Sequence, residues 1–508
     1  MRYILAIDAG YGSCKAMLFD LDSKNYYVGV EKWEYIAGED FLLKEFNPDL
    51  FFEKICENIR KLLKKINAEA KDIVAISSSS MRHSYVFLDE KGKEVYAGPN
   101  VDARGIYYQD LLEEKFGDNL RNITGQWPPL IFAPARLLWF REEQPEKFGK
   151  IKYVLTTNDW IIYKLCNVLA TEPSIASATM FLDIRKKKWY DELLEELKFN
   201  IELPEIYETG SIVGELEEEA AKKMGLAKGI PIVMGGADSQ IAMLSCHAVN
   251  DGDVAVITGT SAPIMMSVSK PIIDEKKRIW TNCHVVSSKW VLEANAQIAG
   301  ANYEWLKNVI KEFLGISDNK IYELMDKKAS EVESALNDIF AFLGPEIMNV
   351  GDISVVRPGI FYFQQPSHPM TSFSLSLKHC IRASLENIAF AIRANVELLE
   401  EIAGKKVDSM TVTGGLTKSK IWPKILSNSS GRKIVTTKIE DGTALGCVIA
   451  AAFGIGLYNN IEEAFKDISK LEEEVSPEKI EDYKRGYERW LELYQKIAEL
   501  SVSIWRKN

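Results

Sequence analysis

The sequence has few of the features that cross-link small proteins or direct them through membranes. Seven cysteines stand singly among 508 residues, without a Cys-x-x-Cys pair. This pattern argues against a disulfide scaffold or a zinc ribbon and favours a reducing compartment. The apolar run at the N-terminus is interrupted at Asp8, too early for a secretory signal. We therefore expect a cytoplasmic protein.

A long hydrophobic run that could anchor the chain in a bilayer is also missing. Residues 442–461 carry no charge, but they are rich in glycine and alanine and are flanked by Asp441 and Glu462 rather than by basic residues. Membrane-spanning helices have a different composition and basic flanks. We predict a buried helix followed by a turn.

An excess of positive charge is absent as well. The chain has 62 Lys and Arg against 73 Asp and Glu, a net charge of -11, and no segregated basic patch. Such a surface repels nucleic acid and anionic lipid, so we expect neither as a partner. With 46% hydrophobic residues, 17 prolines and 32 glycines, the chain has ample material for buried cores, and its length predicts two or three domains.

Strand and helix patterns alternate along the chain, which predicts an α/β fold. Residues 3–7 and 14–19 form two apolar runs around a glycine-rich turn, a pattern that predicts a β-hairpin. Residues 253–257 and 262–268 repeat the pattern about 250 residues later, which indicates two similar domains. We place them at residues 1–246 and 247–508.

Helix signals are clear at three places. Asn47 followed by Pro48 predicts a helix start, and an amphipathic run over residues 381–399 predicts a helix that ends at Gly404. The apolar stripe of residues 480–497 predicts a C-terminal helix packed on its own domain. A partner helix could use the same stripe.

The first hairpin turn has the composition of a phosphate-binding loop. Gly10 and Gly12 allow close approach of the backbone to an anion, Ser13 offers a hydroxyl, Lys15 a positive charge, and Asp8 a carboxylate for hydrated Mg²⁺. For one such motif taken alone, an ordinary glycine turn is the better explanation. The second hairpin turn, with Gly259 and Thr260, offers similar chemistry, and two facing loops favour a phosphate clamp.

A carboxylate and a double glycine complete the candidate chemistry. Asp238 follows an apolar strand and is a candidate base for a substrate hydroxyl, while its alternative role is a helix N-cap. Gly414 and Gly415 end a strand at residues 410–413, where adenine and ribose could lie against backbone, with Lys418 beside them. We expect a helix to begin near Ser419.

These motifs together resemble the FGGY family of carbohydrate kinases, within the actin-like ATPase superfamily. They cover nearly the whole chain in order. The matching stretches are DAGYGSCKAMLFD at 8–20, SMRH at 80–83, NVDARG at 100–105, PARLLWFREEQPEKF at 134–148, TNDWIIYKL at 157–165, TEPSIASATMFLDIRKKKW at 171–189, GGADSQ at 235–240, GDVAVITGTS at 252–261, SLSLKHCIRASLENIAFAI at 374–392, TVTGGLTKSKIWPKIL at 411–426 and EDGTALGCVIAAAFGIGLY at 440–458.

The resemblance implies an α/β fold of two actin-like ATPase (ribonuclease H-like) domains with a central cleft. The N-terminal domain would hold a small polyhydroxy substrate and the C-terminal domain ATP. Asp238 would be the catalytic base and contact the substrate. The resemblance also implies Mg²⁺ linked to Asp8 through water. It implies the following site residues: Gly10, Gly12, Ser13, Lys15, Gly259, Thr260, Gly414, Gly415 and Lys418 for the nucleotide, and Arg82, His83 and Asp102, with Arg104 near it, for the substrate.

The sequence departs from the family pattern at three positions. Tyr11 stands where a small threonine is usual, Lys15 where arginine is usual, and Ala237 where glycine is frequent. Lysine keeps the charge of arginine but loses its bidentate fork. None of the three changes removes a chemically required group.

Several alternatives stay open for the substrate and partners. The SMR, NVDAR, ITGQ and PARLLWF segments look closest to autoinducer-2 kinases. At the position of His83, however, the chain resembles ketopentose kinases such as xylulokinase, which tend to carry histidine there. An actin- or chaperone-like ATPase acting on a protein is the rival from another class, and a homodimer is an open alternative to a monomer.

Overall fold

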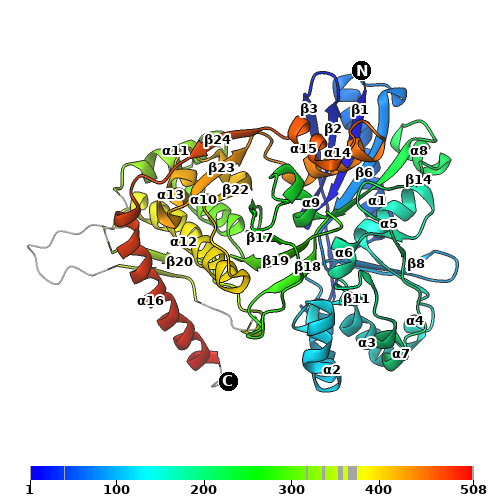
Figure 1. The fold of residues 1–508 in the computed structure, drawn as a ribbon, viewed down its shortest axis with the longest axis horizontal. Coiled ribbons are helices and arrows are strands. Elements are labelled where there is room, and N and C mark those ends of the chain that lie inside the picture. The colour runs from blue at the N-terminus through cyan, green and yellow to red at the C-terminus, as the bar shows by residue number, and fades with distance from the viewer. Residues whose placement is uncertain are drawn as a thin grey trace, which may run out of the picture.

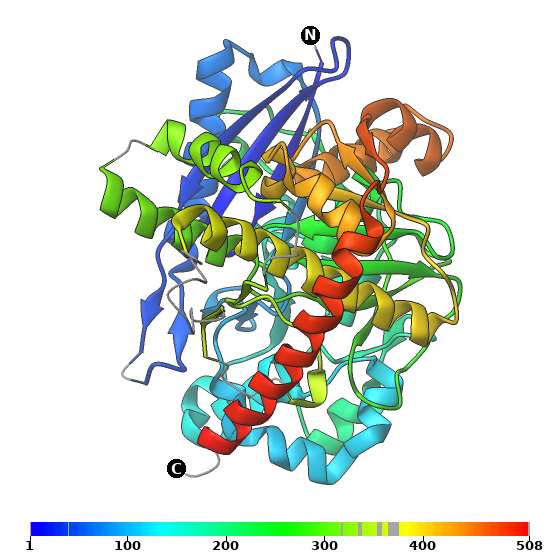
Figure 2. The ribbon, with the colours of Figure 1, turned by 90° about the vertical axis from the view of Figure 1, so that its left-hand side faces the viewer.

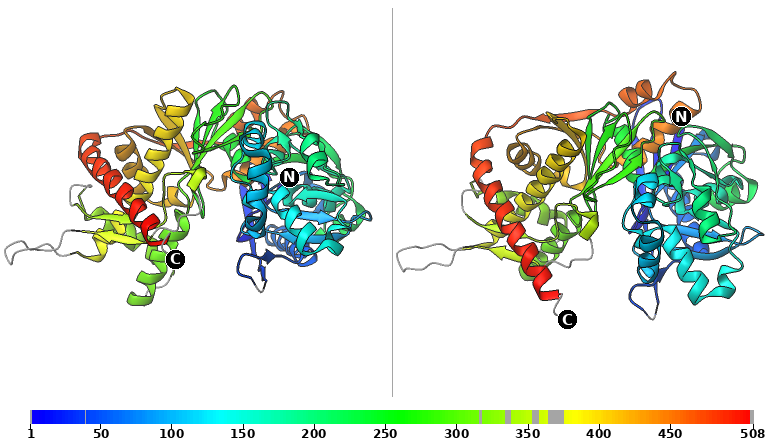
Figure 3. Two further views of the ribbon diagram at one scale, coloured as in Figure 1. Left: turned by 90° about the horizontal axis from the view of Figure 1, so that it is seen from below. Right: turned by 60° about the horizontal axis from the view of Figure 1, so that its bottom comes forward.

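The computed structural model describes residues 2–38, 40–315, 318–333, 338–352, 358–363 and 375–505. Within these ranges the chain forms two α/β halves that lie side by side, the N-terminal half in blue to green and the C-terminal half in green to red (Figure 1, Figure 3). Each half is built around one mixed sheet. The expected two-domain α/β architecture is confirmed.

The N-terminal sheet has the strand order β14-β15-β6-β1-β2-β3. Strands β1, β2 and β3 form an antiparallel meander, and β6 and β15 run parallel to β1. The predicted first hairpin is therefore present. The strands are β1 (Tyr3–Ala9), β2 (Ser13–Asp20), β3 (Tyr26–Lys32), β6 (Ile73–Ser80), β14 (Ile212–Glu215) and β15 (Pro231–Ala237).

The C-terminal sheet repeats this arrangement with the order β18-β19-β17-β16-β22-β23-β24. Strands β16 and β17 form the predicted second hairpin, and β22 and β23 run parallel to β16, as β6 and β15 do to β1. The repeated order confirms two similar halves. The strands are β16 (Val254–Thr258), β17 (Pro263–Val268), β18 (Trp280–Cys283), β19 (Trp290–Asn295), β22 (Ser409–Gly414), β23 (Lys433–Thr437) and β24 (Leu471–Val475).

The predicted helices form as expected because their ends carry local signals. Helix α1 (Pro48–Ile66) begins where the Asn47 side chain accepts the Leu50 N–H at 3.1 Å. Helix α12 (Leu377–Ala403) ends at Gly404, whose φ of 66° suits glycine. The aromatic stripe of α16 (Ile480–Trp505) packs against α12 within the same half (Figure 2). This packing favours the role within its own domain over a partner helix.

The remaining elements cover the sheets or extend the N-terminal half. The helices are α2 (Gln109–Thr124), α3 (Ala133–Glu143), α4 (Pro145–Phe148), α5 (Thr157–Cys166), α6 (Pro173–Ser177), α7 (Asp191–Leu197), α8 (Glu218–Met224), α9 (Asp238–Ser245), α10 (Gly300–Leu314), α11 (Asp318–Ser330), α13 (Trp422–Ser430), α14 (Gly442–Gly454) and α15 (Ile461–Ile468). A three-stranded sheet joins β7 (Tyr85–Leu88), β8 (Glu94–Gly98) and β9 (Tyr153–Thr156). Short strand pairs are β4 (Ile36–Ala37) with β5 (Lys44–Glu45), β10 (Ala170–Thr171) with β13 (Glu205–Ile206), β11 (Leu182–Asp183) with β12 (Lys188–Trp189), and β20 (Phe340–Phe342) with β21 (Ile360–Tyr362).

Helix α14 follows the predicted boundary in sequence but packs on the N-terminal sheet. The boundary near residue 246 separates the two sheets, but α14 and α15 pack against the N-terminal sheet and α9 (Figure 1). Because α14 is apolar on all sides, it is stable only when it is covered on all sides, and the space between α9 and the N-terminal sheet provides this. The uncharged run is thus a buried helix, as predicted. No helix in the described part of the chain is long and apolar enough to cross a membrane.

The contact between α14 and α9 depends on Gly446. A Cβ atom at this position would lie 2.1 Å from the Ile241 carbonyl oxygen, a backbone atom that cannot move independently. We expect Gly446→Ala to lower the free energy of unfolding by about 1–3 kcal/mol, as overpacking does. Gly149→Ala is the matched control, because its φ is -61° and its nearest contact is 3.4 Å. Equal unfolding curves of the two variants in denaturant would contradict the prediction.

Candidate active site

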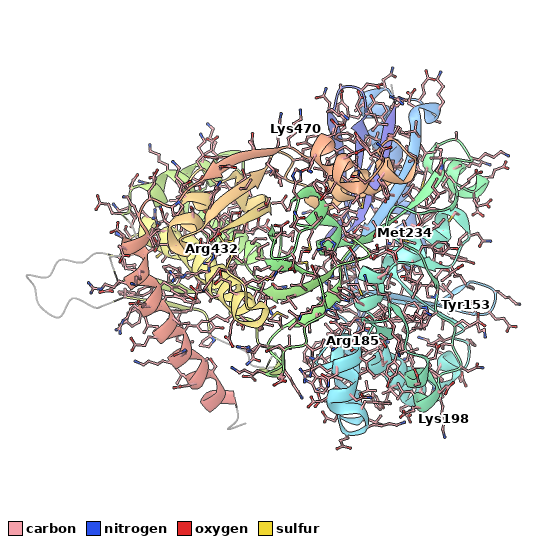
Figure 4. The ribbon with its side chains drawn as sticks, viewed as in Figure 1. Tyr153, Arg185, Lys198, Met234, Arg432 and Lys470 are labelled. Carbon is pink, nitrogen blue, oxygen red and sulfur yellow. The ribbon has the colours of Figure 1, made fainter. Side chains whose placement is uncertain are left out.

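The candidate site forms where parallel strands of the N-terminal sheet end. In the register of β1, β6 and β15, Asp8 lies opposite Ser79, and Ala237 opposite Ser80. The residues that follow these positions therefore emerge at one edge of the sheet. They include the first phosphate loop, Arg82 and Asp238. Met234, labelled in Figure 4, lies on β15 just before this edge and is fully buried.

Asp8 is a buried carboxylate beside the first loop. Its Oδ1 has no hydrogen-bond partner among the described residues, and its Oδ2 lies 3.9 Å from the Lys15 Nζ. Lys15 also pairs with Asp441 at 3.0 Å. Burial raises the pKa of Asp8 to about 7, opposed by Lys15 and reinforced by the negative charges of Asp441 and Asp238. The neighbouring charges of Asp441 and Asp238 thus add to the cost of ionising Asp8, although the described residues contain no group of three or more His, Cys, Asp or Glu that could hold a metal ion by itself.

The first loop is a tight turn that is held from outside by aromatic residues. The Gly10 N–H donates to the Ser13 carbonyl at 3.1 Å, and nothing lies within 4 Å of a Cβ built on Gly12. The Tyr11 carbonyl accepts hydrogen bonds from the Trp33 Nε1, at 3.0 Å, and from the Tyr35 hydroxyl. The Tyr11 ring stacks on Tyr35 with 5.1 Å between centroids. The backbone and the ring of Tyr11 thus hold the loop against the segment that joins β3 to β4.

The second loop and the double glycine are neighbours in the C-terminal sheet. Thr258 pairs with Gly414 in register, and the Thr258 Oγ1 donates to the Thr413 carbonyl at 2.8 Å. Gly414 has a φ of 105° and leads into a short 3-10 turn, Gly415–Lys418. The structure thus brings the Gly259 and Gly414 segments together.

Lys418 ends this short turn, and helix α13 follows it. The next helix, α13, begins at Trp422, three residues after Ser419. Its N-cap residue, Ile421, has no capping side chain, and the Ser419 Oγ accepts the Trp422 N–H at 3.1 Å. The Lys418 side chain is exposed and pairs with Glu440 at 2.7 Å.

Asp238 lies at the junction of β15 and α9, and it is not the N-cap residue. That position belongs to Ala237, which has no capping side chain, and Asp238 is the first helical residue. Its Oδ1 accepts the Ser239 N–H at 2.7 Å. Burial raises the pKa of Asp238, and the Arg82 charge and the Ser239 donors oppose the shift. A carboxylate with a raised pKa is a better general base.

Arg82 links Asp238 to the other half of the protein. Its Nε lies 3.6 Å from the Asp238 Oδ1, while its Nη1 and Nη2 bind both oxygens of Glu293 on β19. The Asn282 Nδ2 donates to the Glu293 Oε2 at 2.8 Å, and the Asn282 Oδ1 accepts from the Gln126 Nε2 at 2.8 Å. Sequence reasoning missed Glu293, Asn282 and Gln126. A lone carboxylate inside the apolar strand WVLEAN was the only available signal for Glu293.

His83 follows Arg82 and is also buried. Its ring lies 5.0 Å from that of Phe132 and 5.4 Å from that of Trp280, so it contacts both halves. Burial, with the charges of Arg82 and Arg136, lowers the pKa of His83 well below 6.5. The imidazole is therefore neutral at pH 7 and offers one donor and one acceptor.

The lowered pKa of His83 can be tested by NMR. The chain has 5 histidines, and His83→Gln would identify the His83 signal in histidine-labelled protein. Because the folded-state pKa is lowered, the unfolded chain binds the proton more tightly, so His83 costs stability as the pH falls below 6.5. We expect no His83 titration between pH 6 and 7. A midpoint at or above 6.5 would contradict this.

Both carboxylate oxygens of Asp102 accept hydrogen bonds from the protein. Its Oδ1 accepts the Lys44 N–H at 3.3 Å, and its Oδ2 accepts from the Tyr96 hydroxyl and from the Arg104 Nε at 2.7 Å. Asp102 and Arg104 are fully buried. Both oxygens of Asp102 thus have donors from the protein, and its contact with the substrate stays a prediction. A role in holding the surrounding segments together is the better interpretation.

Comparison with known proteins agrees with this geometry. The model of the N-terminal domain of the FGGY family of carbohydrate kinases matches residues 3–245, and the model of its C-terminal domain matches residues 254–455. The chain belongs to this family. It is accordingly a phosphotransferase that acts on a hydroxyl group of its substrate, as predicted.

Individual relatives match along their whole length. An autoinducer-2 kinase from Salmonella choleraesuis (strain SC-B67) is 29% identical over 531 residues, covering 99% of this chain and 97% of the relative. One from Yersinia enterocolitica is 29% identical over 530 residues, with 99% and 97% covered. A xylulose kinase structure from Lactobacillus acidophilus superimposes with a TM-score of 0.83 at 20% identity, covering 98% and 99% of the chains. For a Plasmodium falciparum glycerol kinase with ADP, the TM-score is 0.82 at 18% identity, with 98% of each chain covered.

Proposed function

We propose that this protein is an ATP- and Mg²⁺-dependent kinase of a small polyhydroxy compound of the autoinducer-2 type. The observation that carries the proposal is the position of Asp238, a half-buried carboxylate with a raised pKa that faces Arg82 at the strand edge where the first phosphate loop also begins. The full-length similarity to autoinducer-2 kinases supports the substrate class. The repeated strand order of the two sheets supports the actin-like fold.

The mechanism assigns one task to each group. Asp238 accepts the proton of the substrate hydroxyl as this hydroxyl attacks the γ-phosphoryl group in line with the leaving oxygen. Arg82 lies beside Asp238 and can orient the same hydroxyl. The backbone of Gly10, Gly12 and Ser13, with Lys15, would bind phosphate oxygens from the N-terminal half. Gly259 and Thr260 would do so from the C-terminal half, where Gly414, Gly415 and Lys418 would border the nucleoside.

The carboxylates present fit a magnesium ion. The Asp8 Oδ1 is buried without a protein donor among the described residues, and the charges of Asp441 and Asp238 disfavour leaving Asp8 ionised without a cation. Oxygen ligands from a carboxylate and water suit Mg²⁺. When bound, the ion would neutralise charge on the transferring phosphates. Asp8 would hold it through water.

A ketopentose is the second candidate substrate, and His83 favours it. A neutral imidazole presents a different pattern of donors and acceptors from a carboxylate, so it selects a different arrangement of hydroxyls. The Gln126 Oε1 is buried without a partner among the described residues and adds an acceptor near Trp280. These groups suit a hydroxyl-rich ligand of either type.

A single assay separates these possibilities. ADP release would be measured with a panel containing the autoinducer-2 precursor, ketopentoses, sugar alcohols and glycerol, and the position of the phosphate would be read by NMR. We expect the largest kcat/KM for the autoinducer-2 precursor. A preference for ketopentoses would favour the second candidate. ATP turnover that no polyol stimulates, but a protein or polymer does, would support an actin- or chaperone-like ATPase instead.

A further inference from the structure

Glu293 is a buried acid in the C-terminal half whose partner lies in the N-terminal half. Its side chain is fully buried, and it lies on β19 opposite Met265 of β17 and Trp280 of β18. Arg82 reaches it from the segment after β6. An unpaired carboxylate is costly at such a depth, so Glu293 depends on the approach of the other half.

The shape of the guanidinium group sets the direction in which Arg82 points. Glu293 occupies its Nη1 and Nη2, with 2.6 Å between Nη2 and Oε1, so the planar group is held by two parallel bonds. The Nε edge is then turned toward the Asp238 Oδ1 at 3.6 Å. This distance is longer than a hydrogen bond, which leaves the Nε–H free for an oxygen of a ligand.

A second contact between the halves supports the same carboxylate. Asn282 on β18 donates to the Glu293 Oε2 and accepts from Gln126, which belongs to the N-terminal half. The orientation of Glu293 is therefore tied to the N-terminal half through Arg82 and through Gln126. Both connections break when the halves move apart at this point.

We propose that Glu293 is a positioning residue that orients Arg82 beside Asp238 only when the two halves are in contact. Contact of the halves and assembly of the catalytic site are then one event, as in kinases that close around their substrates. This inference rests on the proposed function, because it assigns Asp238 and Arg82 to the reaction.

The test uses Glu293→Gln, which keeps the size of the side chain and removes its charge. We expect kcat to fall by about 10- to 100-fold, in keeping with the cost of a misplaced catalytic group, while the KM for ATP stays within about threefold. In small-angle X-ray scattering with a non-hydrolysable ATP analogue, Mg²⁺ and substrate, the wild-type radius of gyration should decrease and that of Glu293→Gln should decrease less.

A matched control removes another ion pair between the halves, far from Asp238. Lys277 pairs with Asp118 at 2.9 Å near the surface, and we expect Asp118→Asn to keep wild-type kcat and compaction. If Glu293→Gln does not fold, Arg82→Lys keeps the charge but loses the fork and should show the same loss of compaction.

The outcomes separate this inference from the proposed function. A wild-type protein that phosphorylates no panel compound overturns the proposed function, whatever the scattering shows. An active wild-type protein with a Glu293→Gln variant that has wild-type kcat and compaction overturns the positioning role. A variant that is less stable but has wild-type kcat per folded molecule also overturns it, because this is the result of a purely structural contact.

Discussion

Asp238→Asn should abolish phosphorylation while nucleotide binding is retained. The substitution keeps the size of the side chain but removes the proton acceptor, and loss of a general base lowers kcat by about 10²- to 10⁴-fold. Asp238 lies outside the glycine segments assigned to the nucleotide, so the Kd for ADP should change little. A coupled assay of ADP release and calorimetry with ADP measure the two effects.

A surface aspartate provides the control for this substitution. Asp22 forms an exposed ion pair with Arg2 at 3.0 Å, and such pairs contribute little to stability. Asp22→Asn should therefore keep wild-type turnover. If Asp238→Asn retained more than about a tenth of wild-type kcat, the assignment of the base would be wrong, because general-base catalysis contributes at least about 10²-fold.

Gly414→Ala should weaken nucleotide binding and destabilise the C-terminal half. The φ of 105° at Gly414 is unfavourable for any residue with a Cβ, and the new atom would lie 2.3 Å from the Thr258 carbonyl oxygen. Because Thr258 and Gly414 are paired, the substitution would push β16 and β22 apart beside Gly259. We expect a cost of about 1–3 kcal/mol in unfolding free energy.

Substitution of the neighbouring Gly415 is the control that lacks the steric clash expected at Gly414. A Cβ on Gly415 would lie 4.0 Å from the Thr258 carbonyl oxygen, an ordinary contact. Gly415→Ala should therefore unfold like the wild type, and calorimetry with ADP would show whether the nucleoside lies against it. If Gly414→Ala had wild-type stability and wild-type affinity for ADP, the interpretation of this segment would be wrong.

Features with local causes could be predicted from the sequence. Asn47 and Pro48 start a helix through their own side chains, and Gly404 ends one through its backbone freedom, so neighbouring residues suffice to place both. The two hairpins follow from apolar runs around small-residue turns. Asp8 and Asp238 stood out because each carboxylate follows or interrupts an apolar strand next to glycine.

Features that depend on distant segments could not be predicted in this way. The packing of α14 on the sheet of the other half depends on a surface formed by β1, β6 and β15, and nothing within residues 442–454 specifies that surface. Asp102 lies in a family motif, yet Tyr96 and Arg104 donate to its Oδ2 and the Lys44 N–H to its Oδ1, and these contacts became visible only in the folded chain.

The ordered motifs along the chain were thus enough to indicate the family and, through that resemblance, the reaction, because short motifs express local chemistry. The pairing of Arg82 with Glu293, 211 positions apart in the sequence, required the folded chain. The role of a buried carboxylate in an apolar strand cannot be assigned until its cationic partner is known. Here that partner comes from the opposite half of the protein.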